Sequence, residues 1–137
     1  MNILSHLNYL AVLAGAAGYF VLGALWYSPV LFSKKWVALN NIVMTDDDRQ
    51  GVPLIMIMSL ILMLVISLGL AVLMHFMGIA RPVGALKAGM LCGACFSVTA
   101  LGINYVYLKK PMQLFVIDAG YQFIGTALCA LIQGFWI

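Results

Sequence analysis

The chain has 137 residues, of which 65% are hydrophobic and only 8% are charged. A soluble domain usually has about 25% charged residues, so this chain has too few to cover a water-facing surface. Its mean hydropathy of +1.09 predicts a single integral membrane domain of the all-α class. The net charge of +3 comes from lysines and arginines scattered over loops. This distribution excludes the basic patch that a nucleic acid would require.

Four apolar stretches are long enough to cross the hydrocarbon, which takes roughly 20 residues of helix. They cover about residues 7–28, 53–77, 83–107 and 111–136. Pro29 follows the first stretch, Gly78 and Pro82 separate the second from the third, and Pro111 begins the fourth. Because proline disfavours helix at the residue before it, these positions predict the helix ends of a four-helix transmembrane bundle.

The connection between the first two spans predicts a short helix in the membrane interface. Phe32, Trp36 and Leu39 share one helical face, a pattern that suits an interfacial helix. Thr45 followed by aspartates at 46–48 is typical of a helix start, with a Thr cap and acids near the positive end of the helix dipole. A metal site in these aspartates is the alternative, but no ligand spacing supports it.

Basic residues are divided unevenly between the two sides of such a bundle. The first and third loops carry five of them, Lys34, Lys35, Arg49, Lys109 and Lys110. The other side carries two, Arg81 and Lys87. Lys and Arg gather in cytoplasmic loops. We therefore expect a multi-pass protein of the plasma membrane with both termini outside.

The third and fourth spans each carry a distinctive stripe at the period of an α-helix. In the third span it consists of small residues, Gly89, Gly93 and Ser97. In the fourth it is mostly polar and consists of Asp118, Gln122, Gly125, Cys129 and Gln133. Small residues let membrane helices approach closely, so we expect the third span to pack through its stripe.

The turn between these spans predicts which residues face each other. If Pro111 marks the turn, residues equidistant from it lie at equal depth. Ser97 then faces Gly125, and the same count brings Gly93 to Cys129 and Gly89 to Gln133. The sequence thus predicts that the small stripe packs against the polar stripe.

Asp118 is the only acidic residue in any predicted span. An aspartate at the membrane centre costs about 2.5–3.5 kcal/mol and almost always faces the bundle interior. Asn104 lies at the same predicted depth, seven residues before Pro111. Two interpretations stay open: Asp118 belongs to a functional site, or its hydrogen bond to Asn104 only locks the hairpin.

Further polar and aromatic side chains gather at the depth of Asp118. The set, here called the aromatic shelf, comprises Trp26, Tyr27, Ser28, Tyr105, Tyr107 and Tyr121. Aromatic residues at this level usually anchor helices in the interface. The alternative is that the shelf forms a binding site together with Asp118.

Other motifs are weaker. Cys92 and Cys95 match a redox spacing, but they lie within an apolar span, where small packing residues are expected. His6 and His75 are placed near the outer interface and do not make a metal site. We expect no metal, no cofactor and no catalytic residue, because no nucleotide loop, zinc motif or nucleophile elbow is present.

Two segments together resemble a known family of membrane proteins. The residues that carry the resemblance are Gly23–Pro29, Leu31–Phe32 and Lys35–Trp36, then Asn104–Tyr105, Pro111, Leu114–Phe115, Ile117–Tyr121, Gly134 and Trp136. The family comprises small four-span proteins of bacteria and fungi, of unknown function, marked by a Trp-Tyr-Ser-Pro motif. The resemblance implies the four-helix architecture and no activity. Its members often carry His where this chain has Gln122, which weakens any proton relay or metal site there.

Two functions are compatible with these features. The first is an oligomeric channel or transporter for a small ion or polar solute, with Asp118, Gln122 and Gln133 lining the pathway of a homo-oligomer. The second is a non-transporting module, in contact with membrane lipids, that binds a lipid headgroup or a partner protein at the aromatic shelf.

Overall fold

The computed structural model describes residues 2–42 and 50–136. The predicted helix start at Thr45–Asp48 lies outside the described residues. The helical elements in chain order are η1 (Ile3–His6), α1 (Tyr9–Trp26), α2 (Ser33–Asn40), α4 (Val52–Phe76), α5 (Pro82–Cys92), the π-helical turn η2 (Gly93–Ser97), α6 (Val98–Leu108) and α7 (Met112–Gly134).

Four helices are long and apolar enough to cross a membrane, with α5, η2 and α6 forming one of them. They run over Tyr9–Trp26, Val52–Phe76, Pro82–Leu108 and Met112–Gly134, within a few residues of the stretches predicted from hydropathy. The described part of the chain contains helices and no strands. The prediction of an all-α protein with four spans is confirmed.

The helix ends follow from local chemistry. The Asn8 side chain accepts a hydrogen bond from the Ala11 amide and caps α1, and Pro82 begins α5, where a missing amide costs no helical bond. Lys109 ends α6 in the left-handed conformation, with φ of 53°. Gly78, with φ of 63°, lies in the turn after α4, and this conformation costs glycine little.

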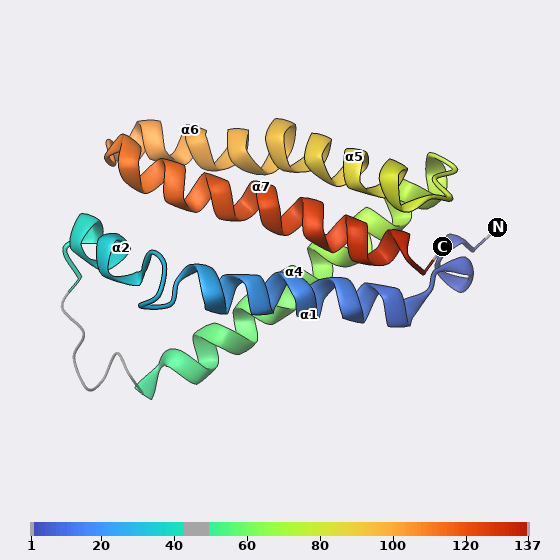
Figure 1. Cartoon of the computed structure of the whole chain (residues 1–137), viewed down its shortest axis with the longest axis horizontal. Coiled ribbons are helices and arrows are strands. Elements are labelled where there is room, and N and C mark those ends of the chain that lie inside the picture. The colour runs from blue at the N-terminus through green and yellow to red at the C-terminus, as the bar shows by residue number, and fades with distance from the viewer. Residues whose placement is uncertain (1, 43–49, 137) are drawn as a thin grey trace.

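Helix α7 is the centre of the bundle (Figure 1). It contacts α5 and α6 on one side and α1 on another, and it also touches α4 and α2. In the most apolar 18-residue stretch of α7, 44% of the residues are buried, whereas in the corresponding stretch of α4 only 11% are buried. Polar residues on α7 therefore have protein neighbours on most sides, whereas α4 presents much of its surface to the surroundings.

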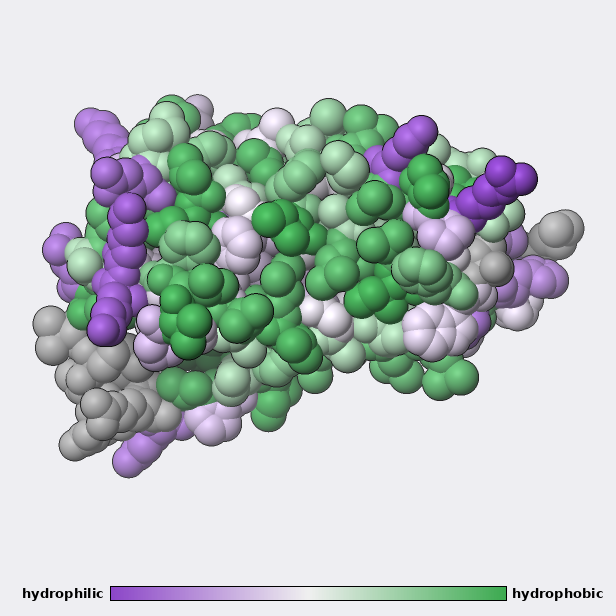
Figure 2. All heavy atoms as spheres, in the orientation of Figure 1, coloured by the Kyte–Doolittle hydropathy of each residue, from purple (hydrophilic) through white to green (hydrophobic). Residues whose placement is uncertain are grey.

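The molecular surface has the polarity of a membrane protein. Figure 2 shows a broad hydrophobic middle, with hydrophilic residues gathered toward the two ends. Large apolar side chains of α4 such as Leu54, Ile57 and Leu62 are exposed. Lipid is the environment in which such a surface is stable.

The packing of α5 and α6 on α7 differs from the prediction by one to two helical turns. A side-chain carbon at Gly89 would lie 2.8 Å from the Thr126 carbonyl oxygen and 2.6 Å from Ala130 Cβ, and one at Gly93 would lie 3.1 Å from Phe123 Cα. The predicted partners, Gln133 and Cys129, face elsewhere. Both glycines do allow close approach to α7, but at other residues.

The shift has a simple physical cause. The chain reverses at Lys109, whose φ is 53°, two residues before Pro111. Moving the centre of the turn by two residues moves every predicted partner by four, which is about one helical turn. Counting from Lys109 places Gly93 opposite residue 125 and Gly102 opposite residue 116. These positions are close to the observed contacts with Phe123 and Phe115.

Candidate functional site

The carboxyl group of Asp118 accepts three hydrogen bonds from three different elements. Its Oδ1 accepts from the Tyr27 hydroxyl at 2.6 Å and from Trp36 Nε1 at 3.1 Å, and its Oδ2 accepts from the Tyr105 hydroxyl. Asp118 lies six residues into α7, about 9 Å along the helix. Each of the three neighbouring groups can donate a hydrogen bond, and a carboxyl group has acceptor sites on both oxygens for them.

The Trp-Tyr-Ser-Pro segment brings two of these donors together. Tyr27 is the residue that ends α1, and the chain then turns sharply. In this turn the Ser28 hydroxyl donates to the Leu25 carbonyl at 2.6 Å, and the Phe32 amide donates to the Trp26 carbonyl at 3.1 Å. The turn leads directly into α2, so that Trp36 reaches back to Asp118.

Aromatic rings surround this turn on the inner side. Trp26 Nε1 donates to the Ile117 carbonyl at 3.0 Å, one residue before Asp118. The Tyr27 ring meets the Tyr121 ring edge to face, with centroids 5.3 Å apart, and meets Trp36 at 5.8 Å. Such aromatic pairs add about 0.5–1.5 kcal/mol beyond their buried area. The shelf residues from α1 and α7 thus form a packed cluster.

Tyr27 stays a hydrogen-bond donor in this environment. Burial first, and then its hydrogen bond to the Asp118 carboxyl group, raise the pKa of the Tyr27 phenol well above the ordinary value of 10.0. Loss of its proton would place a second negative charge beside Asp118. The phenol therefore keeps its proton at neutral pH.

The residue of the third span that contacts Asp118 is Tyr105, and not Asn104 as predicted. Tyr105 is buried, whereas Asn104 is exposed. Neighbouring residues on a helix point about 100° apart, so only one of the two can face α7. Counting residues from the turn does not show in which direction a side chain points around its helix.

Gln122 and Gln133 of α7 make their side-chain hydrogen bonds with α1 and α4 and not with the small stripe of the third span. Gln122 accepts a hydrogen bond from the Tyr19 hydroxyl of α1. Gln133 Nε2 donates to the carbonyl and hydroxyl oxygens of Ser67 in α4, each at 2.8 Å. Gly125 packs under the Tyr19 ring, where a Cβ would lie 2.5 Å from a ring carbon.

Some contacts of this site were missed from sequence. Tyr19 and Ser67 each lie within an apolar span and have no neighbouring polar residue to mark them. The sequence predicts Trp36 only as one of three residues, with Phe32 and Leu39, that share a face of a short interfacial helix. Its nearness to Trp-Tyr-Ser-Pro was the available signal, because a tight turn after α1 folds α2 back toward the span.

A family model described as a protein of unknown function, DUF1761, matches residues 10–134. The chain belongs to this family. The match runs from the start of α1 to the end of α7, so it includes every helix of the bundle. No curated protein and no solved structure matches the chain. Whether Trp-Tyr-Ser-Pro marks the DUF1761 family stays a prediction.

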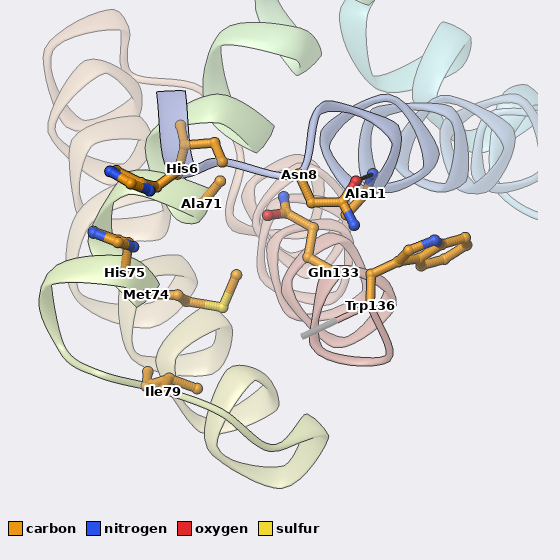
Figure 3. A pocket seen from close by; sticks show the side chains of 10 residues that line it. His6, Asn8, Ala11, Ala71, Met74, His75, Ile79, Gln133 and Trp136 are labelled. Carbon is orange, nitrogen blue, oxygen red and sulfur yellow. Dashed lines mark hydrogen bonds between the residues drawn. The ribbon is translucent and has the colours of Figure 1, made fainter. Parts of the chain in front are cut away.

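The opposite end of this DUF1761 chain contains a pocket of about 200 Å³ (Figure 3). The rings of His6 and His75 lie parallel on one side of it, with centroids 6.3 Å apart, and Gln133 and Trp136 lie on the other side. The structure thus brings together two histidines from η1 and α4, 69 residues apart. Within residues 2–42 and 50–136, no three His, Cys, Asp or Glu side chains are grouped to hold a metal ion.

The cysteine pair of this family member lies where α5 passes into the π-helical turn, with Cys92 at the end of α5 and Cys95 within η2. Cys92 is half-buried, Cys95 is exposed, and both thiols are free. Between them Gly93 contacts the backbone of Phe123. The observed contact at this motif is therefore helix packing through the glycine.

Proposed function

We propose that the protein binds and transports a small cation, with the Asp118 carboxylate as the binding group. The supporting observation is that the three donors on this intramembrane carboxyl group, Tyr27, Trp36 and Tyr105, are all neutral. Ionisable groups within membrane spans commonly belong to ion pathways. A cation that replaces one of these donors would gain the attraction of the carboxylate charge.

Helix α2 is the element that can admit such a cation. It has only eight residues, and isolated helices of this length are unstable in water. Its Trp36 donates to Asp118 at 3.1 Å, and this hydrogen bond joins α2 to the carboxyl group. Movement of α2 away from α7 would open Asp118 to water at that end of the bundle.

The rest of the pathway is closed in the described conformation. Gln122 and Gln133 are hydrogen-bonded to Tyr19 and Ser67 inside one chain. Because their stripe faces the interior of the protomer, the proposed route passes along α7 within a single bundle. A homo-oligomer stays a prediction that this route does not require.

The test is cation flux into vesicles that contain purified wild-type or Asp118→Asn protein. Asparagine keeps the size and one acceptor oxygen of aspartate but lacks its charge. We expect a large loss of flux of the transported ion, measured across a panel of H⁺, Na⁺, K⁺ and a quaternary ammonium ion.

Asp47→Asn is the matched control, because it removes the same charge from the first loop. A thermal unfolding curve establishes that Asp118→Asn still folds. Equal flux through folded Asp118→Asn and wild-type protein would contradict the proposal. Loss of stability without any wild-type flux would support the purely structural role of Asp118.

A second candidate function is the binding of a lipid headgroup or a partner protein at the aromatic shelf. The observation that favours it is that the segment following Trp26, Tyr27 and Ser28 exposes apolar and basic residues together, namely Val30, Leu31, Lys34 and Lys35. Loss of a copurifying lipid or protein in Tyr27→Ala, with no flux in wild type, would favour this candidate over transport.

A further inference from the structure

At the end of the bundle that contains Asp118, a groove lies between α6 and α7, beside the turn that joins them. It has a volume of about 230 Å³ and is lined by Gly102, Tyr105, Val106, Lys110, Met112 and Phe115. Val106 and Met112 are strongly exposed, so the groove opens to the outside of the bundle. Apart from Lys110 and the hydroxyl of Tyr105, its lining is apolar.

Glycine at position 102 leaves room in the groove beside the Phe115 ring. A Cβ at Gly102 would lie 3.4 Å from the Phe115 ring, so a larger side chain would occupy the space over that ring. Tyr105 and Phe115 meet with centroids 5.7 Å apart and an interplanar angle of 61°. Tyr105 is fixed in turn by its hydrogen bond to Asp118, which gives the groove a rigid wall.

One end of the groove carries a positive charge. Lys110 Nζ lies 5.4 Å from the centroid of the Tyr105 ring, a distance at which a cation is attracted to the ring face. Lys110 lies in the turn between two spans, at the boundary between hydrocarbon and water. Phosphate groups of phospholipids occupy this level.

The other end of the groove points into the hydrocarbon. From Lys110 to Gly102 the chain covers eight residues of helix and turn, about 12 Å, within a hydrocarbon layer of about 30 Å. An apolar groove that runs from the membrane surface into the hydrocarbon can hold the part of an acyl chain nearest the headgroup. One anionic lipid molecule could therefore place its phosphate at the positive end of the groove and its acyl chain against the apolar wall.

We infer that the groove between α6 and α7 is a binding site for an anionic phospholipid. Its phosphate contacts Lys110, and its acyl chain lies against Gly102, Val106 and Phe115. The positive-inside rule assigns this end to the cytoplasmic leaflet, where anionic lipids are abundant. The inference does not depend on cation transport, although Tyr105 belongs to both the groove and the Asp118 site.

The experiment is native mass spectrometry of the protein released from nanodiscs of equal parts phosphatidylglycerol and phosphatidylcholine. We expect one retained lipid per chain, with phosphatidylglycerol preferred. Lys110→Gln should lower that preference by about fivefold, the effect of one lysine near an anionic headgroup. Lys109→Gln is the matched control, because Lys109 is exposed on the same turn and does not line the groove.

A second pair of variants tests the apolar wall. Gly102→Leu should lower retention of both lipids by filling the groove. Gly69→Leu should leave retention unchanged, because residue 69 is an exposed glycine of α4 at which a Cβ would meet no atom within 4 Å. Equal preference in wild type, Lys110→Gln and Lys109→Gln would overturn the inference, as would equal retention in the two leucine variants.

Discussion

Tyr105 and Tyr107 lie two residues apart on α6, and only Tyr105 touches Asp118. Tyr105 is 9% exposed and donates to the carboxyl group, whereas Tyr107 is 82% exposed. Hydrogen bonds to charged groups contribute about 1.5–3 kcal/mol each. At this scale the stability of the Asp118 end depends on a few identifiable hydroxyl and indole groups.

We expect Tyr105→Phe to lower the free energy of unfolding by about 1.5–3 kcal/mol, because it leaves one carboxyl oxygen without its donor. Tyr107→Phe removes the same hydroxyl from an exposed ring and should change stability by less than about 0.5 kcal/mol. Reversible unfolding in mixed micelles measures both. Equal effects of the two substitutions would mean that the Tyr105 bond to Asp118 contributes nothing.

At the scale of helices, the contact of α5 with α7 depends on glycines at which the two backbones nearly touch. A Cβ on Gly89 would lie 2.8 Å from a carbonyl oxygen and 2.9 Å from Ala127 Cα. These are backbone atoms, which cannot turn aside as a flexible side chain can. The small stripe of the third span was predicted as a packing face, and this contact supplies the physical reason for Gly89.

Gly89→Ala should therefore lower the free energy of unfolding by about 1–3 kcal/mol, the usual cost of overpacking. Gly69→Ala is the control, since a Cβ at Gly69 meets nothing within 4 Å and alanine favours helix over glycine. Thermal unfolding in one detergent compares the two variants. A Gly89→Ala protein as stable as wild type would show that α5 and α7 lie farther apart.

At the scale of the whole molecule, an even number of spans places both chain ends at one end of the bundle, as Figure 1 shows. The turn at Lys109 and helix α2 lie at the other end. The excess of lysine and arginine in the first and third loops predicts that this second end is cytoplasmic.

Labelling of single cysteines tests this orientation. In a chain with Cys92, Cys95 and Cys129 replaced by alanine, Asn2→Cys should react with a membrane-impermeant thiol reagent in intact cells. Lys109→Cys should react only after the membrane is made permeable. The reverse result would place the termini in the cytoplasm and would assign the groove and Asp118 to the outer leaflet.

Local patterns in the sequence were sufficient for the spans, their ends and the depth of Asp118. Hydropathy sets where a helix can cross lipid, and proline and glycine positions set where it stops. The period of 3.6 residues likewise places Asp118, Gln122 and Gln133 on one face of α7. Each of these features depends on residues close together in the chain.

What only the tertiary structure decided is which element each face meets. The polar face of α7 meets α1 and α4, and the contacts of Gly89 and Gly93 lie one to two helical turns along α7 from the predicted ones. Tyr105 replaces Asn104 beside Asp118, and Trp36 folds back over the span. The direction of a side chain around its helix is fixed by the packing of all helices together, because many small contacts between distant residues must be satisfied at once.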